Sequence, residues 1–264
     1  MNNIFQFAEA FFQLSDVEQK LALTHQARQI DLAGSLNYTP NPSVLQIAEV
    51  KFPDRPVLLA PRQMPKRKLN TAEGVAAFFH AIAHVEFVAI YLAWDILYRF
   101  QGLPVQFYRD WLRVADEEAQ HFALIRAHLR TLHIDYGDLP AHSGLWDHAQ
   151  ETADDLLGRL ALIPRCMEAR GLDVTPALIE KFKTLGDDGS VAILTRILTD
   201  EVGHVQLGSY WFKFVCQQQG LEVEAQYRKL INHYYVGGKP KGPFNRELRK
   251  IAGFSEAELD WLEC

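Results

Sequence analysis

One pattern occurs twice in this 264-residue chain and constrains its fold more than any other feature. A glutamate is followed about 32 residues later by a Glu-x-x-His pair. On a helix, residues three apart share a face, so the carboxylate and the imidazole of each pair can reach the same ion. Two helical hairpins that each supply one Glu and one Glu-x-x-His build a four-helix bundle with a metal site inside it. The residues concerned are Glu86, Glu118 and His121, then Glu168, Glu201 and His204.

The surroundings of these glutamates indicate that they are buried. Glu86 lies in a run of apolar residues, and Glu201 is flanked by Ile197, Leu198, Val202 and Val205. Four ionised carboxylates in a core repel one another and need compensation. Two divalent cations supply it; protonation, or pairing with Arg165 or Arg196, are the alternatives. Carboxylates and imidazoles without thiolates suit iron, manganese or zinc, and bridging carboxylates with one His per ion favour iron or manganese.

Four further residues are candidates for an outer layer of the site. A metal-bound His usually donates its second N–H to a carboxylate or carbonyl. Asp200 precedes Glu201 and Glu117 precedes Glu118, so each is placed to orient the His of the other hairpin, or else is a solvated acidic residue. His84 and His80 lie two and six residues before Glu86, off the ligand face, and are expected to be core or outer-layer histidines.

The chain is expected to be all-α, in three segments. Segment 1–69 contains helices over 4–12 and 16–33, followed over 38–68 by an irregular arm that wraps the main domain. Proline fixes φ and removes a donor, and six of the twelve prolines fall in this arm: Pro40, Pro42, Pro53, Pro56, Pro61 and Pro65. Segment 70–219 is the bundle, and segment 220–264 is a helical extension packed on it.

Capping and breaking residues set the expected helix bounds of the last two segments. Asn70, with Glu73, is expected to begin the first bundle helix, which ends near Phe100 before Gly102. The remaining bundle helices are expected over 105–133, over 144–171 with a kink at Pro164, over a short stretch opened by Thr175-Pro176, and over 190–219. In the extension we expect a helix over 222–235, a Gly/Pro turn, and a last helix opened by Ser255.

Composition excludes several functional classes. A net charge of −6 and a pI of about 5.9 argue against a nucleic-acid protein held mainly by charge. Cys166, Cys216 and Cys264 form no CxxC pair, so a reducing cytoplasm is the expected location. The start has no basic region typical of a signal peptide. No run reaches the roughly 18 uninterrupted apolar residues of a membrane span.

Longer segments of the sequence resemble a known family. The chain resembles the bacterial family filed as domain of unknown function 455 in four segments: HAIAHVEFVAIYLAWDILYRF, FYRDWLRVADEEAQHF, DYGDLPAHSGLWDHA and ILTDEVGHVQLGSYWF. The ligand pattern itself resembles the di-iron carboxylate proteins of the ferritin-like superfamily. This resemblance covers residues 70–264 strongly and implies a ferritin-like fold and a metal site, but no particular reaction. The chain differs from rubrerythrins in lacking a cysteine-rich iron domain.

Three functions follow from such a site. The first is an oxidoreductase that activates O2 to hydroxylate or desaturate a small-molecule or macromolecular substrate, which the sequence does not identify. The second is an iron-handling or peroxide-scavenging protein, and the third is a bundle with purely structural metal ions. No strong nucleic-acid signal and no membrane partner are indicated, and a homodimer is left open.

Overall fold

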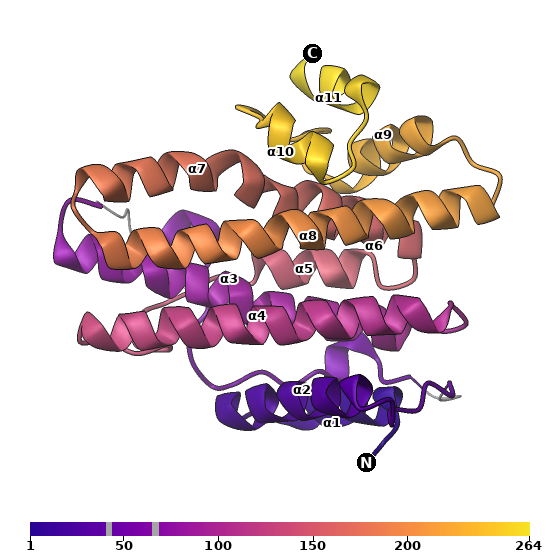
Figure 1. The fold of residues 1–264 in the computed structure, drawn as a ribbon, viewed down its shortest axis with the longest axis horizontal. Coiled ribbons are helices and arrows are strands. Elements are labelled where there is room, and N and C mark those ends of the chain that lie inside the picture. The colour runs from indigo at the N-terminus through magenta and orange to yellow at the C-terminus, as the bar shows by residue number, and fades with distance from the viewer. Residues whose placement is uncertain (41–43, 65–68) are drawn as a thin grey trace. The chain divides into compact units, whose positions relative to one another are not determined.

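The computed structural model describes residues 1–40, 44–64 and 69–264, and Figure 1 shows their path. Within these residues the chain is helical and has no strand, only the isolated bridges Asn3–Asn37 and Leu58–Ala141. The all-α prediction is therefore confirmed. Pro42 and Pro65 of the predicted arm lie outside the described residues.

Two compact units make up the chain, residues Met1–Asp147 and His148–Cys264. Each Glu … Glu-x-x-His copy falls within one unit, the first in unit 1 and the second in unit 2. The division into 1–69, 70–219 and 220–264 stays a prediction.

Unit 1 begins with two helices, and a capping side chain precedes each of them. The Asn3 side chain accepts from the backbone of α1, and that of Asp16 does so for α2. Gly34, at φ +68°, follows the end of α2 in the left-handed conformation that glycine adopts without strain. The helices of this unit are α1 (Ile4–Gln13), α2 (Val17–Leu32), η1 (Ile47–Glu49), η2 (Pro61–Gln63), α3 (Ala72–Arg99), α4 (Val105–Thr131) and the first residues of α5 (Gly144–Glu151).

The hairpin of α3 and α4 is the centre of unit 1, and its two long helices pack on each other (Figure 1). Thr71, rather than the predicted Asn70, begins α3, because its hydroxyl oxygen accepts from the Gly74 N–H at 3.1 Å. The chain turns at Gly102, at φ +84°, as the sequence predicts. Helix α3 is long and apolar enough to cross a membrane by length and composition alone, but 67% of its most apolar window is buried inside the protein. Such burial is typical of a core helix in a soluble protein.

Between α2 and α3, residues 45–52 lie against α3 through both backbone and ring contacts. The Tyr91 hydroxyl donates to the Lys51 carbonyl at 3.0 Å, and the Phe52 ring stacks on that of Tyr91 at 4.3 Å. Further along α3, the Tyr98 hydroxyl oxygen accepts from the Leu45 N–H at 3.0 Å. These contacts satisfy backbone groups of a segment that has little secondary structure of its own.

A fully buried lysine joins α2 to the aromatic core of unit 1. The Lys20 ammonium donates to the Phe11 carbonyl and lies 4.2 Å and 4.4 Å from the ring centres of Phe11 and Tyr91. Burial lowers the pKa of Lys20 to about 7, because the charged form loses its hydration.

Lys20→Met is expected to stabilise the protein below pH 7. The folded-state pKa lies below the usual value of 10.5, so the unfolded chain binds more protons between pH 7 and 10.5 and the wild type gains stability as the pH rises through that window. Methionine removes the buried charge, which is unfavourable, but also its hydrogen bond and ring contacts. We therefore expect the free energy of unfolding to rise by about 1–3 kcal/mol at pH 6. Urea unfolding at pH 6 and pH 9 measures it. An advantage that fails to shrink at pH 9 would contradict this assignment.

Unit 2 differs from the sequence prediction in its first half. The predicted helix over 144–171 is interrupted after Glu151, and a new helix begins at Leu156 with Asp155 as its cap. The helices of this unit are α6 (Leu156–Leu162), η3 (Ile163–Glu168), α7 (Ala169–Thr184), α8 (Asp188–Gln218), α9 (Val223–Tyr234), α10 (Arg246–Ile251) and α11 (Glu256–Glu263), after the last residues of α5.

The predicted break near Gly171 and the separate helix at Thr175-Pro176 are wrong, because α7 runs unbroken through both. Pro176 removes one backbone hydrogen bond at a cost of about 3 kcal/mol. Leu172, Ile179 and Phe182 bury their side chains on one side of the helix, and this burial offsets that cost.

The C-terminal part contains one helix that the sequence analysis missed. Asn245 caps α10, accepting from the Leu248 N–H, inside a stretch predicted to be a turn. The Arg249 guanidinium on α10 pairs with the Asp173 carboxylate of α7 at 2.7 Å, with both side chains buried. The Ser255 and Glu258 capping box of α11 is confirmed.

Candidate metal centre

Three of the six predicted ligands come together inside unit 1. Helix α3 carries Glu86, and α4 carries Glu118 and His121 one turn apart. The three side chains are buried, with 6%, 1% and 1% of their surface exposed, and one potential ligand atom from each lies within 4.8 Å of the others. His121 Nδ1 lies 3.2 Å from Glu86 Oε2 and 3.3 Å from Glu118 Oε2. One ring nitrogen thus faces both carboxylates.

The electrostatics of this group favour a positive charge at its centre. Burial, followed by the charge of Glu118, raises the pKa of Glu86 well above its usual value. Burial alone would lower the pKa of His121, but hydrogen bonds to Glu118 and Glu86 raise it to about 11. Both shifts favour bound protons, and hence added positive charge, at this group. A metal cation in that place would meet two carboxylate oxygens and an imidazole nitrogen, so the donor set fits a metal ion.

In unit 2 the second Glu-x-x-His pair has the same local geometry. His204 Nδ1 lies 3.3 Å from Glu201 Oε1, and His204 is completely buried while Glu201 is half-buried. Each Glu-x-x-His therefore turns the same ring nitrogen toward the carboxylate one turn earlier. In each pair a carboxylate oxygen and an imidazole nitrogen lie close enough to contact one ion.

The remaining glutamate, Glu168, ends a turn of π-helix. Residues Ile163–Glu168 form η3, in place of the simple kink predicted at Pro164. Proline has no N–H for the α-helical ladder, and an inserted π turn accommodates that loss. Such turns are frequent at functional sites, where they change the direction of a side chain. The half-buried Glu168 is thus carried on an element that packs on α8, the helix of Glu201 and His204.

A glycine on α8 makes room for this π turn. A Cβ added at Gly208 would lie 2.4 Å from Pro164 Cβ and 2.6 Å from its Cγ, closer than atoms can approach. The sequence signal for this packing is therefore the combination of Pro164 with Gly208, a glycine in the interior of a helix.

Gly208→Ala is expected to destabilise the protein by about 1–3 kcal/mol, as overpacking does. An alanine in a helix interior normally stabilises a protein by about 0.5–1 kcal/mol relative to glycine. A destabilising effect at Gly208 would therefore indicate close packing against Pro164. Gly171→Ala on α7 is the matched control, since its added Cβ meets nothing within 4 Å. Chemical unfolding of both variants measures the difference. Equal stabilisation of the two would contradict close packing at Pro164.

The two acidic residues predicted to orient the histidines have arginine partners on their own helices. Asp200 accepts from Arg196 at 2.6 Å, and Glu117 accepts from Arg113 at 3.1 Å. Arg165, the other arginine considered as a counter-charge, pairs with Glu258 at 2.7 Å. Orientation of the ligand histidines by Asp200 and Glu117 stays a prediction.

His80 and His84 contact the loop that follows α4. His84 Nδ1 lies 2.9 Å from the Tyr136 hydroxyl and its Nε2 lies 3.1 Å from the His142 carbonyl oxygen. Burial lowers the pKa of His84 to about 4, so it is neutral at pH 7. His80 Nε2 accepts from the Gly137 N–H at 3.0 Å. Both histidines thus hold residues 136–142 against α3, a role that no sequence spacing indicates, and their part in an outer layer of the site stays a prediction.

Fold and site together define a helical protein in which a buried glutamate and histidine group can hold a metal ion. The chain belongs to the family described as Protein of unknown function (DUF455), which matches residues 13–260. It is 46% identical over 218 residues to an uncharacterized protein of Haemophilus influenzae, a match that covers 80% of this chain and 75% of that protein. No solved structure matches the chain.

Proposed function

We propose that this chain is a ferritin-like di-metal carboxylate protein that binds two iron ions and activates O2 to oxidise an organic substrate. In this proposal four helices form a bundle: α3, α4, α8 and the helix that runs from α6 through η3 into α7. The ligands are the six residues of the repeated pattern: Glu86, Glu118, His121, Glu168, Glu201 and His204.

The observation that carries the proposal is the buried group of Glu86, Glu118 and His121. A carboxylate pair with little solvent exposure is unfavourable unless a cation or a shared proton compensates it. The second pair, Glu201 and His204, repeats the distance and the ring nitrogen of the first. If the two copies meet in the bundle, four carboxylates balance the four positive charges of two divalent ions.

The protein's own residues would position the ions and keep water away. The four glutamates would supply carboxylate oxygens to the ions, and each histidine would contribute one nitrogen. Two ferrous ions, when bound, supply electrons for the reduction of O2. Phe87 and Phe122, each one residue beyond a proposed ligand, pack at 5.0 Å between ring centres on the same hairpin. Such apolar packing on the helices that carry the ligands would help to keep water from a reactive site.

Anaerobic titration with ferrous iron, followed by addition of O2, tests this function. We expect saturation at about two ions per chain, rapid O2 consumption, and oxidised iron that stays bound at the same ratio. Iron accumulating far beyond two per chain would contradict an oxygenase and favour storage. Two bound ferrous ions that do not consume O2 would contradict it in favour of a structural role.

A further inference from the structure

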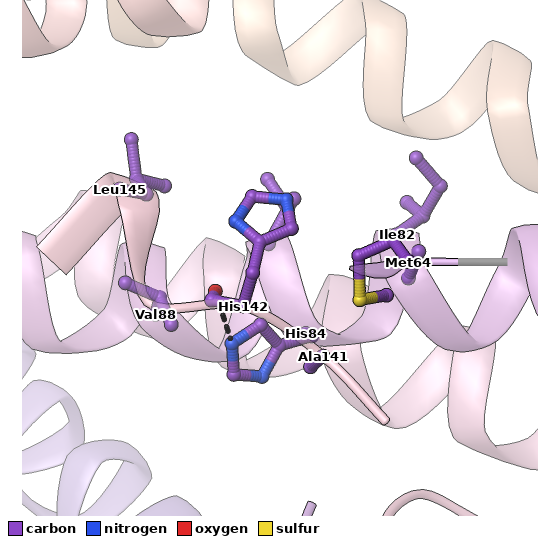
Figure 2. A pocket seen from close by; sticks show the side chains of 9 residues that line it. Met64, Ile82, His84, Val88, Ala141, His142 and Leu145 are labelled. Atoms are coloured by element: carbon purple, nitrogen blue, oxygen red, sulfur yellow. Dashed lines mark hydrogen bonds between the residues drawn. The ribbon is translucent and has the colours of Figure 1, made fainter. Parts of the chain in front are cut away.

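Unit 1 contains a cavity of about 140 Å³ along one face of α3. Figure 2 shows that His84 and His142 lie near its middle, with Leu145 on one side and Met64 and Ile82 on the other. Val85, 43% exposed, lies at the opening to solvent. The full lining consists of Met64, Ala81, Ile82, His84, Val85, Val88, Ala141, His142 and Leu145.

The size and lining of this cavity select a small, uncharged, apolar group. An engineered apolar cavity of about 150 Å³ in another protein takes up benzene, so this volume suits a ring of about six carbons. Seven of the nine lining side chains are apolar, and none of the lining residues that the structure describes is Asp, Glu, Lys or Arg. A charged group would lose hydration there without a charged partner among the described lining residues.

One lining residue offers a polar contact to such a ligand. Both ring nitrogens of His84 are engaged, by Tyr136 and by the His142 carbonyl, so its ring serves as part of the wall. His142 Nδ1 accepts from the Gly144 N–H at 3.3 Å. In the neutral imidazole this places the proton on Nε2, which has no hydrogen bond among the described residues and can donate to a ligand.

We propose that this cavity binds an uncharged aromatic group that carries one hydrogen-bond acceptor, with the ring against Ile82 and Val88 and the acceptor on His142 Nε2. Because Val85 precedes Glu86 on α3, the ligand lies against the helix that supplies a proposed metal ligand. Its role as a substrate site rests on the proposed function, whereas its role as a binding site does not require a metal.

Two probes of matched size test the proposal on the full-length, metal-free chain. Acetophenone carries a ring and a carbonyl acceptor, and isopropylbenzene has the same number and branching of non-hydrogen atoms without the acceptor. Ligand-observed NMR titration is expected to show both binding, with acetophenone about two- to tenfold tighter, the range of one net hydrogen bond. No binding of acetophenone, or equal affinity for the two probes, would overturn the proposal. Because no metal is present, such a failure leaves the iron titration unaffected.

Three variants locate the site. Val85→Trp, at a partly exposed position, is expected to fill the opening and weaken acetophenone binding by more than about tenfold. His142→Phe is expected to lower acetophenone affinity to that of isopropylbenzene and to leave isopropylbenzene binding intact. Leu124→Trp, on α4 at 39% exposure, is the control and should bind as the wild type does. Unchanged acetophenone affinity in Val85→Trp, with thermal unfolding showing it folded, would place the ligand elsewhere.

Discussion

Glu86→Ala is expected to remove at least one of two metal ions from the purified protein. Glu86 is buried, and its carboxylate oxygen lies 3.2 Å from the imidazole nitrogen that the same ion would bind. Loss of a ligating carboxylate leaves fewer donors than iron or manganese requires and does not create a new one. Glu168→Ala should have the same effect, because it removes the corresponding member of the second copy. Metal analysis after anaerobic loading and desalting measures the loss.

Glu18→Ala, on α2 at an exposed ion pair with Arg126, is the control and should retain both ions. If Glu86→Ala and Glu168→Ala both kept two ions, the ligand assignment would be wrong.

The effect of Glu86→Gln on the free energy of unfolding should reverse its sign when metal is bound. In the metal-free protein, Glu86→Gln removes a carboxyl that burial and the charge of Glu118 make costly to ionise, so we expect higher stability. Glu118 Oε2 stays 3.3 Å from His121 Nδ1, so the imidazole keeps one carboxylate partner in the variant. In the metal-loaded protein the same variant should be less stable, because binding of the ion stabilises the native wild type.

Glu258→Ala is expected to destabilise the protein by about 3–5 kcal/mol, the cost of leaving a buried charge without its partner. The Arg165 guanidinium pairs with Glu258 at 2.7 Å, and both side chains are almost completely buried. It also lies 4.3–4.8 Å from the ring centres of Tyr227, Phe212 and Phe254. Removal of Glu258 therefore leaves a cation among aromatic rings at the point where α11 meets the π turn.

Urea unfolding of Glu258→Ala measures this cost, and two further variants define its origin. Glu263→Ala removes an exposed partner of Arg246 and should cost less than about 1 kcal/mol. A double variant with methionine at both 165 and 258 should recover much of the loss, since well-packed apolar residues replace buried ion pairs at little cost. If Glu258→Ala were no more destabilising than Glu263→Ala, the buried pair would not anchor the C-terminal helices.

Helix positions could be predicted from the sequence wherever a local signal decides them. Ser255 caps its helix as expected, and Gly34 and Gly102 take the left-handed backbone that ends a helix or makes a turn. The Glu-x-x-His spacing predicted which residues share a face, and the structure brings Glu86, Glu118 and His121 together in unit 1. All of these features depend on residues within a few positions of one another or on a repeated spacing.

Features decided by packing could not be predicted in this way. Helix α7 continues through Pro176 because its buried face outweighs one lost hydrogen bond, and α10 forms where Arg249 reaches Asp173, 76 positions earlier. The π turn depends on Pro164 and Gly208, which are remote in sequence and adjacent in space. His80 and His84 bind a loop 52 to 59 positions later. Local propensity carries no information about such partners.

Anomalous diffraction from crystals of the iron-loaded protein tests the central claim most directly. Data on both sides of the iron absorption edge are expected to show two peaks per chain, with Glu86, Glu118 and His121 on one side and Glu168, Glu201 and His204 on the other. A single peak bound by one hairpin alone, or no peak at these residues, would contradict a di-metal centre built from two copies of one pattern.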